Sequence, residues 1–291
     1  MDSMIHILIL ICIYYILTAS TQLLVDMGNL MSLCQAAFFG IGAYITALIL
    51  SPNAIDITLA IPIVILATGL IAFIIAIPAV SMKDDYFILA TLGFQFIIFT
   101  IFVNVKWNNG VSGTEGLGGI EPGTIFGQDL ITTDTHILIL ILITTFVVFR
   151  IISHLINSPF GRTLKGIKNS EVLIISLGRS PKKYKMWTFV IAASLAGLSG
   201  YLYATYSRYI NPSDFNLDKS ILILAAVIIG GTKKIGPVLG AALIVLIPEI
   251  SRRFTFISSI DAPLREVIYG MLLLAVLYIR LKKGDHKFQL R

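Results

Sequence analysis

The side chains best placed to do chemistry lie in one polar interval, SPFGRTLKGIKNSEVLIISLGRSPKKYK, at residues 158–185. Against one acid, Glu171, this interval carries the basic residues Arg162, Lys165, Lys168, Arg179, Lys182, Lys183 and Lys185. Basic side chains at this density can pair with acids of a soluble partner or with lipid phosphates. The interval therefore predicts a contact surface, and both partners stay open.

Motifs for catalysis and nucleotide binding are absent from the sequence. There is no G-x-x-x-x-G-K-[ST] phosphate loop, no H-E-x-x-H and no G-x-S-x-G. The two cysteines, Cys12 and Cys34, lie in apolar segments and have no metal or disulfide spacing. The basic residues are not interleaved with aromatic ones, as single-strand nucleic acid binding would need. We expect no enzyme, no metal, no cofactor and no nucleic acid partner.

The elements that must position these residues are membrane spans. Apolar residues make up 56% of the 291 residues and charged residues 13%, whereas soluble domains carry about 25% charged residues. A membrane helix needs about 20 apolar residues. The expected spans are 4–20, 30–50, 59–80, 86–104, 135–153, 186–207, 219–230, 236–250 and 264–279. We predict an all-α integral membrane protein with about 8–9 transmembrane helices in a single domain, residues 1–291.

Two of these spans, 219–230 and 236–250, are too short to cross the bilayer as simple rods. The sequence GGTKKIGP separates them, and Gly/Pro breaks of this kind are typical of discontinuous helices at a transport pathway. A short tilted pair packed inside the bundle is the alternative. Buried polar groups need a partner or a wet cavity, so each polar candidate lines a path or bonds another helix. The path candidates are Gln35, Thr91, Gln95, Asn104, Gly230 and Gly231.

The distribution of Lys and Arg predicts the orientation, because short basic loops stay cytoplasmic. The interval 157–185 and the tail 280–291 are expected inside, with the amino terminus outside. The loop 105–134 has one cation and four acids and is expected outside. Only Arg252 and Arg253 disagree with this assignment. The span interiors hold almost no ionisable residues, which disfavours a proton-driven carrier and favours an ATPase on another chain as the energy source.

Within the basic interval, SPFGRTLKGIKNSEVLIISLG resembles the cytoplasmic loop of bacterial ABC-importer permeases for branched-chain amino acids. That loop has the pattern S-x-x-G-R-x-x-x-A-[IL]-[RK]-x-x-E-x-x-A-x-x-x-G. The matching residues are Ser158, Gly161, Arg162, Ile167, Lys168, Glu171 and Gly178. The sequence departs from the pattern at Gly166 and Ile174, where the family has alanine.

Further segments resemble the same family in the correct order. They are GNLMSLCQAAFFGIGAY, DDYFILATLGF, VSGTEGL, FVIAASLAGLSGYLYA, GGTKKIGPVLGAAL and IYGMLLLAVLYIR. Cys34, Val111 and Ser112 depart from the family pattern. Within this importer group the chain is similar to the longer, M-type permease partner. The superfamily also carries urea, amides and sugars, so those solutes stay open, as does a secondary carrier acting alone or a membrane scaffold.

The resemblance implies the ABC-importer permease fold in the cytoplasmic (inner) membrane of a bacterium, with a cytoplasmic carboxyl terminus. It implies a second homologous permease, two cytoplasmic ATPase subunits that use ATP, and an extracytoplasmic solute-binding protein. A short helix, 171–177, would dock the ATPase. The expected coupling residues are Gly161, Arg162, Lys165, Lys168, Glu171 and Gly178. In the Gly-rich outer loop, Gly113, Thr114 and Gly116 would contact the binding protein, unless that loop is a flexible connector.

Overall fold

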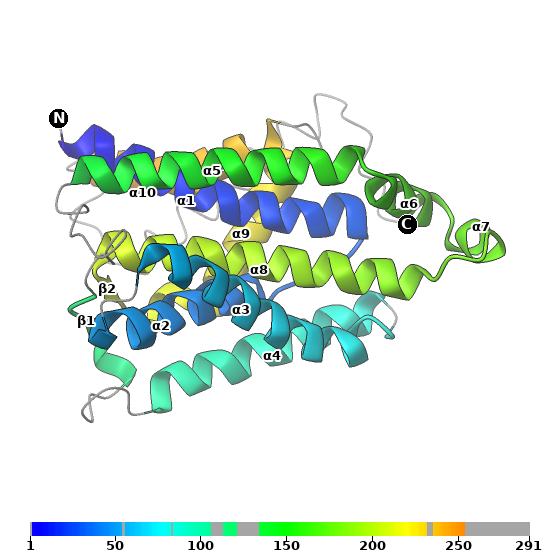
Figure 1. The fold of residues 1–291 in the computed structure, drawn as a ribbon, viewed down its shortest axis with the longest axis horizontal. Helices are drawn as coiled ribbons and strands as arrows, with labels where there is room; N and C mark the ends of the chain where they lie inside the picture. Colours follow the sequence, from blue (N-terminus) through cyan, green and yellow to red (C-terminus); the bar gives the residue numbers. More distant parts are fainter. Residues whose placement is uncertain are drawn as a thin grey trace.

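The computed structural model describes residues 2–53, 56–82, 84–105, 113–120, 134–231 and 235–253. These residues are almost entirely helical, which confirms the all-α class (Figure 1). The expected last span, 264–279, and the basic tail, 280–291, lie outside the described residues. The helices are α1 Asp2–Gln22, α2 Gln35–Asn53, α3 Ile57–Ala79, α4 Asp84–Asn104, α5 Asp134–Asn157, α6 Pro159–Asn169, α7 Glu171–Ser176, α8 Pro181–Ser207, α9 Leu217–Gly230 and α10 Gly236–Arg253.

Eight of the nine expected spans therefore correspond to helices. Five described stretches are long and apolar enough to cross a membrane, namely Met4–Gly28, Leu59–Ala79, Asp85–Asn104, Thr135–Asn157 and Pro181–Ser207. α2 and α10 have shorter apolar stretches, Gln35–Leu48 and Gly236–Leu246, and α9 has 14 residues. The three short helical turns are η1 Leu23–Gly28, η2 Gly113–Glu115 and η3 Pro212–Phe215.

The second span differs from its expected form, because its helix begins at Gln35 and not at residue 30. α1 continues into the π-helical turn η1, and Asn29 then takes a left-handed conformation with φ 50°. The chain runs without helical structure until α2 begins. Its backbone is partly satisfied by other parts of the protein: the Leu33 N–H donates to Thr91 Oγ1 at 3.2 Å. Irregular backbone at membrane depth is tolerated where protein supplies such partners.

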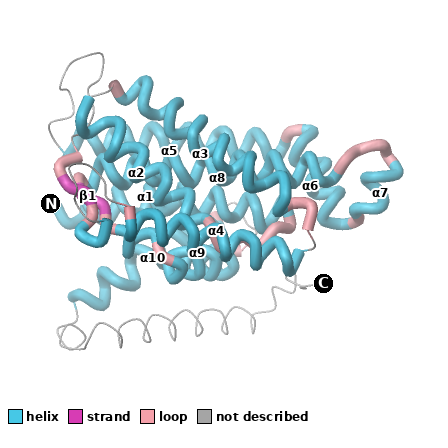
Figure 2. The backbone as a smooth tube through the Cα atoms, turned by 90° about the horizontal axis from the view of Figure 1, so that it is seen from below, coloured by secondary structure: helices cyan, strands magenta, loops and turns pink. Residues whose placement is uncertain are grey.

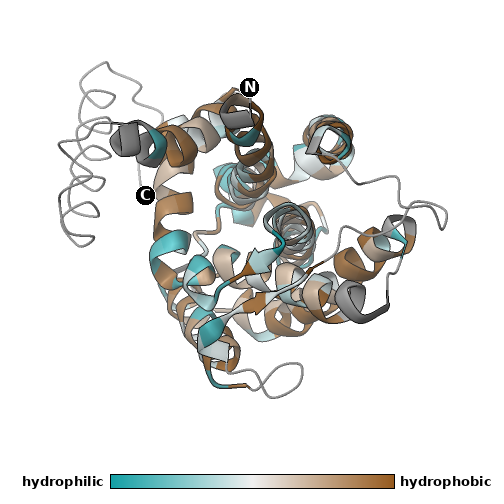
Figure 3. Ribbon diagram, turned by 90° about the vertical axis from the view of Figure 1, so that its left-hand side faces the viewer, coloured by the Kyte–Doolittle hydropathy of each residue, from teal (hydrophilic) through white to brown (hydrophobic). Residues whose placement is uncertain are grey.

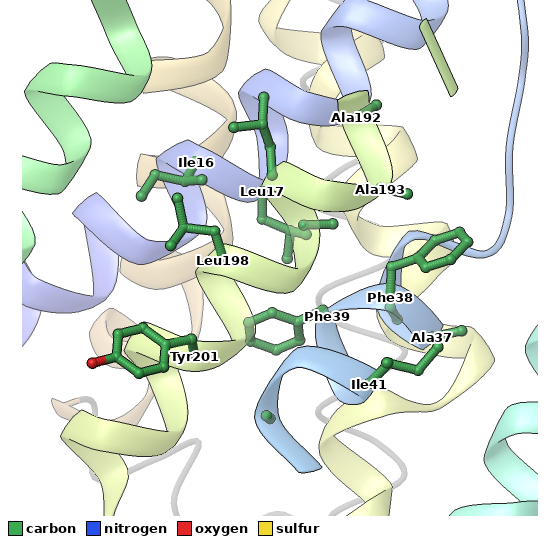
Figure 4. Close-up of a cluster of buried hydrophobic side chains, with 14 of the residues drawn as sticks. Ile16, Leu17, Ala37, Phe38, Phe39, Ile41, Ala192, Ala193, Leu198 and Tyr201 are labelled. Carbon is green, nitrogen blue, oxygen red and sulfur yellow. The ribbon is translucent and has the colours of Figure 1, made fainter. Parts of the chain in front are cut away.

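The core is centred on α2 and α8, which pack against each other more extensively than any other described pair. Side chains from α1 complete this core, with Leu17, Phe38 and Tyr201 fully buried (Figure 4). The two backbones approach closely at glycines: a Cβ on Gly42 would lie 2.0 Å from the Gly197 carbonyl oxygen, and one on Gly200 would lie 1.9 Å from that of Phe39. Small residues allow this approach, which is a common basis of helix packing in membranes.

The outer helices α3, α4 and α5 carry large apolar side chains on their outward surfaces. Examples are Leu66, Ile97 and Phe146, each about 60% exposed or more. Viewed from the end that holds the amino terminus, the outer helices are predominantly hydrophobic (Figure 3). Such surfaces belong in lipid or against another membrane protein. The chain is therefore a multi-pass membrane protein.

The two ends of the bundle differ in what they carry. At one end the chain begins, and a two-stranded sheet pairs β1 Leu117–Gly118 with β2 Tyr209–Ile210. At the other end α6 and α7 extend beyond the membrane helices (Figures 1 and 2). The basic interval and residues 113–120 of the Gly-rich loop thus lie at opposite ends of the bundle, and the prediction that the first faces the cytoplasm and the second the outside stays a prediction.

Candidate functional site

The helix α6 is fixed to the membrane body through its apolar face. Ser158 caps its first turn, accepting a hydrogen bond from the Gly161 N–H at 3.3 Å, and Pro159 suits the first helical position. Leu164 and Ile167 are buried against the turn η1 at the end of α1. A Cβ on Gly161 would lie 2.4 Å from the Ile156 carbonyl oxygen, so glycine permits the tight passage from α5 to α6.

The helix α7 has the form that the sequence predicts. Ser170 caps it by accepting from the Leu173 N–H at 3.4 Å. Gly178 follows the helix with φ +74°, and the Arg179 N–H donates to the Ile174 carbonyl at 3.1 Å. This is the arrangement of a glycine C-cap, so the predicted ending at Gly178 is confirmed.

Side-chain contacts link α7 and the connection after it to α8 and to α6. Glu171 forms an ion pair with Lys185 at the start of α8, and Arg179 donates a hydrogen bond to Thr163 on α6. Glu171 therefore pairs within its own chain. A force applied to α7 can pass through these contacts to α8 and α6.

The two departures from the family pattern compensate each other in space. Ile174 is buried, and a Cβ on Gly166 would lie 2.8 Å from Ile174 Cδ1. The missing side chain at Gly166 therefore makes room for the larger one at Ile174. α6 and α7 therefore pack closely although Gly166 and Ile174 both differ from the family pattern.

The remaining apolar side chains of the α7 segment form an exposed surface, which we call the α7 face. They are Val172 at 76%, Leu173 at 63%, Ile175 at 59% and Leu177 at 71% exposed. None of them is among the coupling residues that the sequence predicts, although VLIISL, an apolar run inside a basic interval, indicates them. An exposed apolar helix face next to cationic residues suits a protein partner whose groove is apolar and whose rim is acidic.

The basic residues of α6 are all exposed to solvent. Lys168 Nζ donates to the Asp26 carbonyl oxygen at 3.2 Å, which ties α6 to η1. Arg162 and Lys165 make no ion pair with any other described residue. No group of three or more His, Cys, Asp or Glu within the described ranges could hold a metal ion.

Gln95 is the centre of a buried hydrogen-bond node. Its Oε1 accepts from the Ala37 N–H at 2.8 Å and from Ser220 Oγ at 3.1 Å, and its Nε2 donates to the Phe215 carbonyl at 2.7 Å. The amide thereby joins α4 to the first turns of both α2 and α9. For Gln95 the structure favours the interhelical bond over a path-lining role.

Most of the other path candidates are also satisfied within the protein. Thr91 receives the Leu33 N–H and donates to Ile88, while Asn104 is exposed and bonds its own helix. Gly230 and Gly231 form the tight passage between α9 and α10, where a Cβ on Gly230 would lie 2.3 Å from the Gly236 carbonyl oxygen.

Gln35 is different, because it is 1% exposed and neither atom of its amide has a hydrogen-bond partner among the described residues. It opens α2, next to the node around Gln95. A buried amide without a partner costs about 1–3 kcal/mol. Gln35 is therefore the one polar candidate whose surroundings leave hydrogen-bonding capacity for a solute or water.

The same substitution at the two glutamines should change stability in opposite directions. Gln95→Leu leaves three polar groups without their partner and should lower the free energy of unfolding by about 3 kcal/mol. Gln35→Leu removes an unsatisfied amide and should raise it by about 1 kcal/mol. Thermal unfolding of the purified full chain in detergent compares the two. Equal destabilisation by both would contradict the assigned roles.

The Gly-rich loop is held by contacts at the other end of the bundle. A Cβ on Gly113 would lie 2.1 Å from the Phe102 carbonyl oxygen, and Gly116 has φ +76°. Tyr209 Oη donates to the Glu115 carbonyl at 2.7 Å, beside the β1–β2 pair. Thr114 lies between the two glycines in η2. Residues 113–120 are thus anchored to the segment that connects α8 to α9, and contact with a binding protein remains a prediction.

The helical membrane fold and the α6–α7 unit outside it are those expected of a transport permease, and a family match identifies the class. The family described as the permease component of the branched-chain amino acid transport system matches residues 3–277. The chain belongs to this family.

Among curated proteins, the chain is similar to permeases named LivM. It is 28% identical, over 83% of its length, to the high-affinity branched-chain amino acid transport system permease protein LivM of Escherichia coli, and equally to that of Salmonella typhimurium. The chain spans 62% of the length of these two relatives. It is 23% identical to a probable branched-chain amino acid transport permease protein LivM of Methanocaldococcus jannaschii, over 88% of this chain and 80% of that protein. No solved structure matches the chain.

Proposed function

We propose that this chain is the permease subunit of an ABC importer and forms a translocation path for branched-chain amino acids. The observation that carries the proposal is the α7 face, an apolar surface presented by a braced helical unit outside the membrane body. The family match and the printed names of the LivM relatives support the solute class.

The proposed assembly follows from the absence of a phosphate-binding motif in the sequence and from the exposed α7 face. With no phosphate-binding motif of its own, it would bind no cofactor, and ATP would be used by two cytoplasmic ATPase subunits, one docked on α7. A second homologous permease would pair with it, and a solute-binding protein would meet the loop around Gly113, Thr114 and Gly116. The α6–α7 end and the carboxyl terminus would face the cytoplasm of a bacterium, across its inner membrane.

Transport would arise from rigid movement of helices. Closure of the ATPases on ATP would displace α7, and the bonds of Glu171 and Arg179 would pass this displacement to α8 and α6. α6 packs on η1, so α1 would move with it. A rotation of this kind switches access without remodelling the core. Gln35 would contact the solute, or a water molecule bound to it, where the non-helical segment before α2 ends.

Reconstitution tests this proposal. Vesicles that hold the chain with its sister permease, ATPase subunits and binding protein should take up leucine only when ATP is supplied on the α7 side. Urea and ribose, offered in parallel, should not be taken up. Gradient-driven leucine uptake by the chain alone would instead favour a secondary carrier. Uptake of urea or ribose in place of leucine would show that the proposed solute class is wrong.

A further inference from the structure

A cavity of about 370 Å³ lies between α1, α5 and α6, at the end of the bundle that carries the basic interval. It is separate from the α7 face and from the node around Gln95. Its walls come from α1 with η1, from α5 and from α6, and Pro237 of α10 contributes at one edge.

The lining of this cavity is polar and charged mainly at one end. The polar side chains gather at the α6 end, where Gln22, Asp26, Asn157, Lys165 and Lys168 lie. Leu23, Met27 and Ile156 also line the α6 end. Further along the same helices, toward the other end of the bundle, Ser153 is the one further polar residue of the lining, and the rest is apolar or aromatic: Tyr15, Ala19, Phe149 and Ile152. One end of the cavity therefore suits a charged group, and the rest suits hydrocarbon.

The depth of the cavity fits one leaflet of a bilayer. Tyr15 and Asp26 both line the cavity and are eleven positions apart along α1 and η1, or about 16 Å along the helix axis. Half of the hydrocarbon thickness of a bilayer is about 15 Å. A lipid whose headgroup lies at Asp26 would thus have room for acyl chain down to about the bilayer midplane.

Charge at the polar end selects the headgroup. Lys165 and Lys168 are three residues apart and share one face of α6. Lys165 has no partner among the described residues. The Asp26 carboxylate accepts from Gln22 Nε2 at 2.7 Å, and its second oxygen can accept from a headgroup hydroxyl. Two ammonium groups against one carboxylate leave a net positive charge, which favours an anionic phosphate diester over a zwitterionic headgroup.

We propose that this cavity binds one anionic phospholipid of the phosphatidylglycerol type, with its phosphate on Lys165 and Lys168 and one of its two acyl chains along Tyr15 and Phe149. Of the two partners that the sequence leaves open for these lysines, the geometry assigns the lipid phosphate. The lipid site depends neither on the transported solute nor on an ATPase. A negative result for lipid binding would therefore not bear on the proposed transport function.

The test is lipid retention by the purified full chain, counted by native mass spectrometry after exchange into phosphatidylglycerol, phosphatidylethanolamine or phosphatidylcholine. We expect one phosphatidylglycerol to be retained in preference to the other two. Each surface lysine contributes about fivefold to such binding, so Lys165→Gln with Lys168→Gln should weaken retention about 25-fold. Inorganic phosphate alone should not displace the lipid.

The matched control removes the same charge from the same interval. Lys182 and Lys183 are exposed and do not line the cavity, so Lys182→Gln with Lys183→Gln should leave retention unchanged. Equal loss in both double variants, preference for phosphatidylethanolamine, or displacement by inorganic phosphate would overturn the proposal. Unchanged retention in the Lys165/Lys168 variant, with loss of ATPase binding, would assign these lysines to the protein partner instead.

A second measurement does not depend on the lysines. In a chain carrying Trp107→Phe and Trp187→Phe, a tryptophan introduced by Phe149→Trp should be quenched by acyl-brominated phosphatidylglycerol at a low fraction of that lipid. The control is Ile97→Trp on the outer surface of α4, where quenching should follow the bulk lipid composition. Identical quenching curves at the two positions would also overturn the proposal.

Discussion

Replacing Leu173 and Leu177 together by serine is expected to abolish ATP-driven uptake, while the chain inserts and folds normally. Both side chains are more than 60% exposed, so the isolated subunit loses little packing. Burial of each leucine against a partner is worth about 2 kcal/mol, so the affinity for the ATPase should fall by about 100- to 1000-fold. Co-purification of the ATPase subunit and leucine uptake in vesicles measure the two effects.

Glu171→Gln is the matched control for this prediction. It removes the ion pair with Lys185 and leaves the α7 face in place. The Glu171 side chain is 49% exposed, and surface ion pairs contribute less than about 1 kcal/mol, so uptake should fall only a few-fold. Glu171→Lys, which places two cations together, should be more severe. If Glu171→Gln alone abolished ATPase binding and the serine variant did not, the carboxylate and not the apolar face would hold the partner.

Gly200→Val is expected to prevent folding of the membrane body. A Cβ at this position would lie 1.9 Å from the Phe39 carbonyl oxygen, so α2 and α8 would have to separate. These helices form the centre of the core, and overpacking of backbone against backbone should cost about 4 kcal/mol or more. The yield of monodisperse protein and its thermal unfolding in detergent would show this loss.

Gly93→Val on α4 provides the comparison. A Cβ built on Gly93 meets no atom within 4 Å, so the same substitution in a membrane helix should change stability by less than about 1 kcal/mol. Similar losses at Gly93 and Gly200 would mean that valine in a membrane helix is itself harmful, and that the close approach of α2 and α8 is not the cause.

The close packing of α2 on α8 also bears on the proposed transport function. Gly42, Gly197 and Gly200 allow the two helices to approach closely, while α7 is joined to the start of α8 through Glu171 and Lys185. In the proposed mechanism, a movement of α7 would therefore reach the helix that anchors the core. This arrangement suits a permease whose parts move as rigid bodies.

Local properties of the sequence were sufficient for the membrane class, for the eight expected spans that fall within the described residues and for the helix α7, which Gly178 terminates. Hydrophobicity and length select a membrane helix, and a glycine C-cap needs only its own neighbourhood. The family resemblance also came from local motifs, and the match over residues 3–277 confirmed it.

The tertiary structure alone decided which groups meet across long stretches of chain. Gln95 and Gln35 are both amides in apolar segments, yet only Gln95 finds partners, on residues 58 and more than a hundred positions away. The break before Gln35, the packing of Ile174 over Gly166 and the cavity beside Lys165 are likewise absent from any short window of sequence. Hydrophobicity places a helix in the bilayer, but the rotation of each helix and its neighbours depend on packing summed over the whole bundle.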